Sequence, residues 1–541
     1  MFKTNLLSTL GLCSAAFLPV GEVQAVKQAR PNIVFIMSDD HAYQAISAYG
    51  SGLNETPNID RLAREGVIFS RACVGNSICA PSRATMLTGK HSFVHGKIDN
   101  IHRFNWDQEN FPKLLQQSGY QTALVGKIHL DGIPQGFDYS AVLPGQGDYY
   151  NPDFIVNGKK EQIHGYVTKI TTQLALKWLK SRNPDKPFCL LYHQKAPHRE
   201  WLPEPKYYKE FVHKEFKEPE TLFDDYSGRG EAARAAEMRI LRDQHWSGDS
   251  KIYPEVMDRL GLTEPTNWGL KAYHGNMNRM DETQRASWDS VYRPINEKFE
   301  KEYASMSKQD LTRWRFQRYM QDYLACIASV DDGVGEMLDY LDKAGLADNT
   351  IVIYTSDQGF YLGEHGWFDK RFMYEESFRT PLLIRYPKEI KPGTKISKLV
   401  QNIDFAPTFL DYAGVSIPSD IQGESFRKLV SGETSEWRDA VYYTFYEYPA
   451  VHMVKRHYGV ATERYKLIHF YYDVDEWEMY DLEKDPHEMK SVYNDPAYAD
   501  VQKIMHKRLT ELREKYGDSD ANDQKYIDQY LKATQKKENS K

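Results

Sequence analysis

Short apolar runs recur along the chain, and each ends abruptly in polar residues. They span residues 32–37, 121–126, 187–192 and 351–355. Runs of this length, apolar at nearly every position, predict strands that are buried on both faces of a sheet. The first run is followed by Ser38-Asp39-Asp40, and the last by Ser356-Asp357-Gln358-Gly359. Each run therefore predicts a strand that delivers polar side chains at its carboxyl end.

Segments with helical spacing of apolar positions lie between these strands, at residues 56–66, 111–119, 167–182 and 319–344. Alternating strands and helices predict an α/β fold in which helices cover both faces of the sheet. Ligands of such sheets bind beyond the carboxyl ends of the strands. Residues 206–315 are polar, aromatic and irregular, which predicts an insertion that either shapes the cleft or only elaborates the surface.

The pattern changes after about residue 437. Residues 440–446, 458–470 and 477–482 predict strands, and residues 500–516 predict a helix. Together they indicate a small antiparallel α+β subdomain over residues 437–516, which follows a larger domain over residues 26–436. Residues 517–541 are polar and rich in Lys toward the end, so we expect a tail with a frayed terminus.

The first 25 residues have the pattern of a signal peptide. Lys3 precedes an apolar stretch over residues 6–20, and Val23-Gln24-Ala25 has the form of a cleavage site. The stretch is too short to span a membrane, and no later stretch is long and apolar enough to do so. We expect a secreted or periplasmic protein. Four of the five cysteines would remain, too few for a disulfide-dense scaffold.

The net charge of the 541-residue chain is −7. An acidic chain is a poor candidate for general nucleic-acid binding, so we expect no nucleic-acid partner. If the substrate is an anion, positive charge must be gathered locally at its binding site.

One segment carries a specific chemical signature. Residues 79–90 read Cys-Ala-Pro-Ser-Arg-Ala-Thr-Met-Leu-Thr-Gly-Lys, which matches C-x-P-S-R followed by L-T-G. Through this motif the chain resembles the formylglycine-dependent sulfatases of the alkaline-phosphatase-like superfamily, over residues 30–516. The resemblance implies a mixed sheet flanked by helices, with a smaller C-terminal α+β subdomain.

The resemblance implies that Cys79 is oxidised to formylglycine (3-oxoalanine) by a maturation enzyme. In the family, the hydrated aldehyde attacks sulfur, the alcohol leaves, and the second hydroxyl then expels sulfate. Pro81 suits the first turn of a helix, which would place Cys79 at a helix N-terminus that favours anions. Without the motif, a buried cysteine that begins a helix would be the simpler interpretation.

Oxygen-bearing side chains after two of the predicted strands indicate a metal site. Asp39, Asp40, Asp357 and Gln358 suit a hard cation such as Ca²⁺. In similar sulfatases this set and the modified cysteine, here Cys79, hold one calcium ion. Relatives often have Asn where Gln358 stands, so this ligand departs from the pattern. A carboxylate pair after a strand can also serve as a helix cap.

Basic residues follow the other strands. The resemblance implies that Lys127 and Lys370 bind sulfate and that His129 contacts the formylglycine hydroxyl. It makes His198 a sulfate ligand and the general acid for the leaving oxygen, while Arg83 holds the formylglycine and neutralises the cluster. Each of these residues taken alone would more often be a solvated surface charge.

The substrate is indicated by weaker signals. Residues 446–458 and 476–482 look similar to bacterial sulfatases that act on N-acetylglucosamine 6-sulfate in mucin or heparan-type glycans. We therefore expect a carbohydrate sulfatase with a sulfated sugar as its substrate. Candidate sugar contacts are Trp201, His452, Lys455, Arg456 and His457. Surface charges and a packing tryptophan remain the plainer interpretation of these five.

Three alternatives stay open at this point. The first is a sulfatase for another sulfate position of a carbohydrate, and the second is a phosphoester or phosphonate hydrolase of the same superfamily. Two-metal phosphatases usually need more carboxylate and His ligands, and the Lys127, Lys370 and His198 set favours sulfate. The third is an inactive glycan-binding relative, which the full set of catalytic positions disfavours.

Overall fold

A large mixed sheet forms the centre of the molecule in the computed structural model, which describes Met1 and residues 30–538. The segment expected to be the signal peptide, residues 1–25, lies outside the described residues except for Met1. The sheet has ten strands in the order β13-β2-β12-β9-β1-β8-β4-β5-β6-β7. In chain order they are β1 Asn32–Ser38, β2 Val67–Phe69, β4 Gln121–Gly126, β5 Tyr139–Val142, β6 Asp153–Val156, β7 Lys159–Gln162, β8 Phe188–His193, β9 Thr350–Ser356, β12 Leu382–Arg385 and β13 Thr394–Ile396.

The four strands that the apolar runs predict lie side by side. β9, β1, β8 and β4 are parallel neighbours, and the register pairs Met37 with both His193 and Thr355. Their carboxyl ends therefore meet at one edge of the sheet. β12 runs antiparallel to β9, and β6 and β7 continue the far edge as antiparallel strands, so the sheet is mixed as expected.

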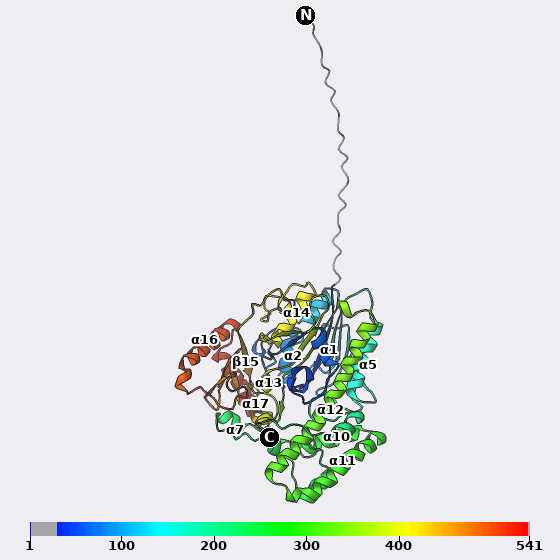
Figure 1. The fold of residues 1–541 in the computed structure, drawn as a ribbon, viewed down its shortest axis with the longest axis vertical. Helices are drawn as coiled ribbons and strands as arrows, with labels where there is room; N and C mark the ends of the chain where they lie inside the picture. Colours follow the sequence, from blue (N-terminus) through cyan, green and yellow to red (C-terminus); the bar gives the residue numbers. More distant parts are fainter. Residues whose placement is uncertain (2–29, 539–541) are drawn as a thin grey trace.

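Helices cover both faces of the sheet (Figure 1). Two sets of helices lie on opposite faces of the sheet, and side chains alternate between these faces along β1. Val34 and Ile36 pack into one core with residues of the first helix set. Ile33 and Phe35 pack into a second core with residues of the other set. The first set is α1 Ile59–Glu65, α5 Val167–Ser181 and α12 Lys308–Lys343; the other set is α2 Cys79–Thr88, α4 Phe111–Gln117 and α14 Phe405–Tyr412. Every residue of β1 is buried, as its sequence predicts.

Two helices begin elsewhere than predicted. α1 begins at Ile59 rather than at residue 56, because a residue before proline is pushed out of the helical region and Pro57 follows Thr56. α12 begins at Lys308 rather than at residue 319. Its start is a capping box between Ser307 and Asp310, a local signal that the predicted boundary overlooked.

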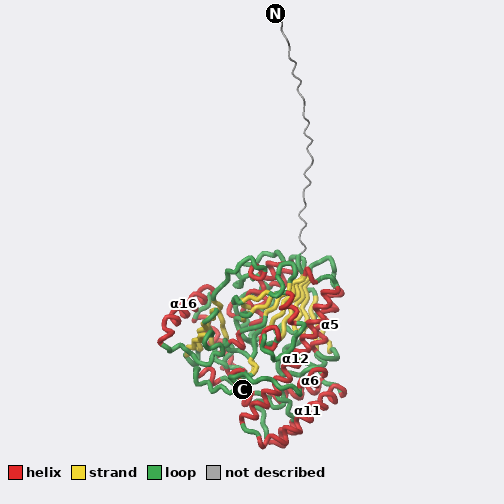
Figure 2. Tube along the Cα trace, in the orientation of Figure 1, coloured by secondary structure: helices red, strands yellow, loops and turns green. Residues whose placement is uncertain are grey.

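The predicted insertion is mainly helical and forms a lobe beside the carboxyl edge of the sheet (Figure 2). The first half of α12 packs with it. Its helices are α6 Pro205–Phe211, α7 Glu231–Ala235, α8 Ile240–Asp243, α9 Pro254–Leu260, α10 Trp268–Arg279 and α11 Glu282–Glu302.

The C-terminal subdomain contains an antiparallel four-stranded sheet. The strands are β15 Ala440–Phe445, β16 His457–Thr462, β17 Tyr465–Phe470 and β18 Glu476–Asp481, and α16 Ala499–Tyr516 packs on the first three. The predicted strand over residues 458–470 is in fact a hairpin, β16 and β17. Short elements complete the chain: β3 Ala72–Cys73, β14 Val400–Gln401, β10 Tyr361–Leu362, β11 Phe368–Asp369, α3 Ser92–His95, α13 Glu375–Phe378 and α15 Arg427–Val430.

The polar tail expected over residues 517–541 is largely helical. Residues Asp520–Glu538 form helix α17. Tyr526 and Ile527 are buried, and Ile527 joins the core between the small sheet and α16. Apolar side chains spaced among the lysines thus anchor the helix.

Within residues 30–538, no helix is both long enough and apolar enough to cross a membrane.

Candidate active site

Cys79 is the first residue of α2, and the helix lies wholly inside the protein. Ile78 precedes it with extended backbone, and Pro81 occupies the first turn, where the missing N–H costs no hydrogen bond. The Cys79 side chain is 1% exposed. Burial raises the pKa of its thiol to about 12, so the unmodified cysteine is neutral and a poor nucleophile.

The carboxyl ends of β1 and β9 bring four oxygen-bearing residues together. Asp39 and Asp40 follow β1, while Asp357 and Gln358 follow β9, and all four are fully buried. Carboxylate oxygens of Asp39, Asp40 and Asp357 lie within 4.8 Å of one another. The Asp40 N–H donates to Asp357 Oδ1 at 3.0 Å, and Asp40 takes a left-handed φ of 65°, which turns the chain toward the cluster.

Three cations compensate this buried negative charge. Arg83 donates to Asp357 Oδ2 from Nε at 3.0 Å and lies 2.9 Å from the same oxygen through Nη2. Lys127 pairs with Asp39 and Lys370 with Asp40. Burial raises the pKa of the Asp40 carboxyl to about 7 despite Lys370. Burial also acts on Asp357, but Arg83, Lys370 and Lys127 outweigh it and hold the pKa of Asp357 below its usual value.

The donor set fits a divalent cation. Among the described residues, Asp39 Oδ1, Asp40 Oδ2 and Gln358 Oε1 are buried without a hydrogen-bond partner. Gln358 donates its amide N–H to Asp40, so its carbonyl oxygen stays available as a ligand. Three carboxylates and one amide oxygen are the ligands that Ca²⁺ prefers. Gln358 thus offers the same kind of oxygen as the Asn that is common in the family.

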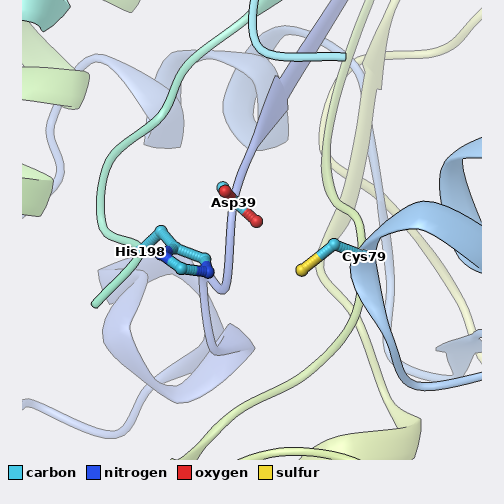
Figure 3. A group of neighbouring side chains, drawn as sticks. All are labelled: Asp39, Cys79 and His198. Atoms are coloured by element: carbon cyan, nitrogen blue, oxygen red, sulfur yellow. The ribbon is translucent and has the colours of Figure 1, made fainter. Parts of the chain in front are cut away.

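His198 points into the same cluster from the loop after β8 (Figure 3). Its Nδ1 donates to the Arg199 carbonyl at 2.5 Å, which leaves Nε2 facing the cluster, 3.8 Å from Asp40 Oδ2. One ligand atom each of His198, Cys79 and Asp39 lie within 4.8 Å of one another. Burial and the charges of Lys127, Lys370 and Lys195 hold the pKa of His198 well below its usual value, so the ring is neutral.

Lys127 and His129 follow β4, the fourth strand of the parallel group. Lys127 pairs with Asp39, donates to Gln146, and accepts a hydrogen bond at its carbonyl oxygen from Arg83 Nη1 at 2.8 Å. His129 has a left-handed φ of 52°. Burial, followed by the charges of Lys127 and Arg83, lowers the pKa of His129 well below its usual value.

A cavity of about 620 Å³ opens over this cluster. Cys79, His198 and Lys370 line it, which is a size and setting suited to a small polar ligand. The insertion supplies part of its wall through α10, so the first interpretation of that segment, that it shapes the cleft, is correct. Other lining residues are Asn100, Ile101, Pro144, Gln146, Gly147, Asp148, Tyr149, Lys195, Arg199, Glu200, Trp268, Lys271, Ala272, Gly275, Asn276, Asp369, Arg371, Glu447, Ala450, Val451 and His452.

The family model for sulfatases matches residues 31–415. The chain belongs to the sulfatase family. A second model, N-sulphoglucosamine sulphohydrolase, C-terminal, matches residues 363–515. The enzyme is accordingly a sulfatase, as the Cys79 motif predicts, and the alkaline-phosphatase-like fold is confirmed.

Known relatives are similar over nearly the whole length of this sulfatase. An N-acetylglucosamine-6-O-sulfatase from Bacteroides thetaiotaomicron is 48% identical over 528 residues, which cover 96% of this chain and 92% of the relative. The human N-acetylglucosamine-6-sulfatase is 27% identical over 466 residues, 81% of this chain and 70% of that protein.

Solved structures give the same picture. A protein in complex with its substrate D-glucosamine-2-N,6-O-disulfate matches with a TM-score of 0.87 and 49% identity, covering 91% of this chain and 99% of that one. A phosphonate monoester hydrolase from Silicibacter pomeroyi matches with a TM-score of 0.65 at 20% identity, over 90% of this chain and 96% of that one, and shares the fold.

The structure of this sulfatase places four of the five expected sugar contacts outside the lining of the cavity. Trp201 is fully buried, with its ring centroid 4.5 Å from that of Tyr319, so it has no free face for a sugar. His457 is also fully buried and packs among aromatic rings of the C-terminal core. Lys455 pairs with Asp473, Arg456 donates to the Tyr448 carbonyl, and neither lines the cavity.

His452 is the expected sugar contact that does line the cavity. Its Nε2 lies 3.2 Å from Asp369 Oδ2 and its Nδ1 donates to the Glu237 carbonyl at 2.6 Å. The ring is therefore held by Asp369 of β11 on one side and by Glu237 of the insertion on the other.

Sequence reasoning missed other cavity residues. Arg371 lies between Asp369 and Glu447, and its position directly after Lys370 was an available signal. Trp268 is 55% exposed, and a tryptophan in a polar segment was a second signal. Asn100, whose Oδ1 accepts from the Ala80 N–H at 3.3 Å, carried no signal that the sequence alone could provide.

Proposed function

We propose that this sulfatase removes the 6-O-sulfate of N-acetylglucosamine, or of another N-substituted glucosamine, in mucin or heparan-type glycans. The observation that carries the proposal is the 48% identity to an N-acetylglucosamine-6-O-sulfatase across 96% of the chain. A span of that length includes the insertion and the C-terminal segments that line the cavity. The match to a structure that holds D-glucosamine-2-N,6-O-disulfate supports the same substrate class.

The nucleophile in this proposal is formylglycine made from Cys79 by a maturation enzyme. The Cys79 sulfur marks the place that the aldehyde oxygen would take after oxidation. The hydrated aldehyde supplies a hydroxyl that can attack sulfur, chemistry that the neutral thiol at this position does not offer. Because Cys79 is 1% exposed, the maturation enzyme has to reach it before α2 packs into the protein.

One calcium ion held by Asp39, Asp40, Asp357, Gln358 and the modified Cys79 completes the centre. The ion would supply positive charge to a sulfate oxygen and to the nucleophile. The buried oxygens without hydrogen-bond partners support this assignment. Arg83 keeps Asp357 ionised and in place, since two of its nitrogens contact the same carboxylate oxygen.

In this proposal the basic residues bind the sulfate and supply the proton that the leaving sugar oxygen needs. Lys127 pairs with Asp39 and Lys370 with Asp40, and both would neutralise the sulfate oxygens. His129 would hold the nucleophilic hydroxyl. The Nε2 atom of His198 faces the cluster, and a bound sulfate would offset the positive charges that lower the pKa of His198. The ring could then carry the proton that the leaving sugar oxygen needs.

Residues 1–25 act as a signal peptide that directs the enzyme to the periplasm or outside the cell. Residues 26–436 form the catalytic domain, and residues 437–516 form the subdomain that contributes His452 to the cavity. Sugars bind through His452 and the cavity walls.

A panel of defined sulfated sugars tests the function. Purified enzyme is incubated with N-acetylglucosamine carrying sulfate at the 3 or the 6 position, with N-sulfated glucosamine, and with 2-sulfated uronic acid and 4-sulfated galactosamine, and released sulfate is measured. The proposal expects release from the 6-sulfate alone. Release from another position and none from the 6-sulfate would refute it.

A further inference from the structure

A second cavity adjoins the first. It has a volume of about 760 Å³ and shares five lining residues with the cavity over Cys79: Arg199, Trp268, Ala450, Val451 and His452. Trp268 is 55% exposed and Val451 is 62% exposed. The shared residues therefore form an open ridge between two hollows, rather than a closed wall, and one ligand can lie across both.

The ridge is held in place from both sides. Trp268 begins α10 of the insertion, and its indole Nε1 donates to Glu200 Oε1 at 2.9 Å. Val451 belongs to the segment between β15 and β16, where the Glu237 N–H donates to the His452 carbonyl at 2.8 Å. An exposed indole face on a fixed support suits the apolar C–H face of a sugar ring.

The charges of the second cavity differ from those at the sulfate centre. Arg199 is bound by Asp249 through two hydrogen bonds of 2.8 and 2.6 Å, and Arg242 by Asp243 through two of 2.6 and 2.9 Å. Burial lowers the pKa of His245 to about 4, so this ring is neutral. Glu237 adds a carboxylate for which the described residues contain no ion pair within 4 Å. Both arginines of the lining are thus already paired with carboxylates, and an anionic ligand would find no free cation among the lining residues.

Its remaining surface is suited to a sugar without charge. Pro265, Ala450 and Met453 provide apolar area next to Trp268, and the Thr266 hydroxyl contacts His245 Nε2 at 2.9 Å. Glu237, Asp243 and Arg242 offer hydrogen bonds to hydroxyl groups at the rim. Apolar area combined with a few polar groups is typical of small-ligand sites.

We propose that the second cavity binds an uncharged sugar residue linked to the sulfated glucosamine, and that it disfavours a uronic acid at the same place. The inference rests on the proposed function, because the first cavity must hold the 6-sulfated glucosamine. It narrows the proposed glycans to those whose neighbouring residue is neutral, as in mucin-type chains, because the glucosamine of heparan-type glycans is linked to uronic acids.

Matched disaccharides test the inference. N-acetylglucosamine 6-sulfate is compared alone, with a glucose attached, and with a glucuronic acid attached in the same linkage, through C1 or through O4. The two disaccharides differ only in the carboxylate. The kcat/KM of the glucose compound in at least one linkage should exceed that of the monosaccharide, and the glucuronic acid compound should fall below the glucose compound by about fivefold.

Two variants with opposite expected effects test whether the second cavity causes the preference between the two disaccharides. Glu237→Lys should raise the ratio of kcat/KM for the glucuronic acid compound over the glucose compound by about fivefold, while Arg242→Gln, which frees Asp243, should lower it. The control Glu436→Lys makes the same charge change at an exposed residue outside both cavities and should leave the ratio as it is. Opposite shifts cannot come from general loss of folding.

Equal kcat/KM values for the monosaccharide and both disaccharides would overturn the inference while leaving the proposed function intact. Equal ratios in the two variants and the control would overturn it as well. Failure to release sulfate from any of the three compounds would instead refute the proposed function.

Discussion

The Lys370 ammonium lies 3.3 Å from Cys79 Sγ and at the same time pairs with Asp40. Burial alone would lower the pKa of Lys370, but Asp40 and the neighbouring anions outweigh it and raise this pKa above its usual value. The side chain is 4% exposed and stays charged. One cation thus connects Cys79 at the start of α2 with Asp40 after the end of β1.

Lys370→Met should lower kcat/KM for the sugar sulfate by about 100-fold or more, because a preorganised charge next to the reacting oxygens is lost. Lys370→Arg should restore little of the lost kcat/KM, since the planar guanidinium cannot replace a compact ammonium between Asp40 and Cys79. Sulfate release under initial-rate conditions measures both. The exposed Lys391→Met serves as the control, and a Lys370→Met enzyme as active as this control would remove Lys370 from the site.

The parallel strands and the residues after them could be predicted from the sequence. The apolar runs of β1 and β9 are buried throughout, as is typical of strands in a parallel sheet, and parallel strands carry their ends to one edge. That is why Asp39, Asp357, Lys127 and His198 lie together although the chain separates them widely.

The sugar-facing residues could not be predicted in the same way. Trp201 follows His198 closely in sequence, but its ring turns into the core against α12. His457 alternates inward on β16, where aromatic rings surround it. Asn100 reaches the cavity from a loop and Trp268 from the start of α10, and the positions of both depend on tertiary packing, which no local pattern encodes.

Calcium should stabilise the folded enzyme, because binding to the folded state alone adds about 2.7 kcal/mol at a concentration of 100 times Kd. Chelation should abolish activity, and added Ca²⁺ should restore it and raise Tm. Asp40→Asn should lose most of the Tm shift, and the exposed Asp348→Asn should keep it. Thermal denaturation with and without Ca²⁺ measures the shift. A full shift in Asp40→Asn would argue against this metal site.

Arg83→Met should destabilise the fold by about 3–5 kcal/mol, because it leaves the buried Asp357 carboxylate without its main partner. Arg61 makes two comparable contacts of 2.8 Å at the surface, to Asp339 and Asp342. Arg61→Met should therefore cost no more than about 1 kcal/mol. Urea unfolding gives both free energies, and equal values would mean that burial at Arg83 does not matter.

His198→Ala should affect substrates according to their leaving groups. A sugar oxygen needs a proton as it leaves, so kcat for the sugar sulfate should fall by about 10²–10⁴. The phenol of an aryl sulfate with an acidic leaving group needs little protonation as it leaves. The kcat for this substrate should therefore fall by less than about 10-fold. The exposed His213→Ala is the control. Equal losses for both substrates would assign His198 to sulfate binding rather than to proton transfer.

The central claim is that a modified Cys79 cleaves the 6-sulfate of a glucosamine. Mass spectrometry of the peptide that contains Cys79, combined with sulfate release from N-acetylglucosamine 6-sulfate by the same preparation, tests it most directly. The account predicts a peptide lighter by one sulfur and two hydrogens and heavier by one oxygen, activity in proportion to that species, and none in Cys79→Ala. Full activity from the unmodified peptide, or from Cys79→Ala, would contradict it.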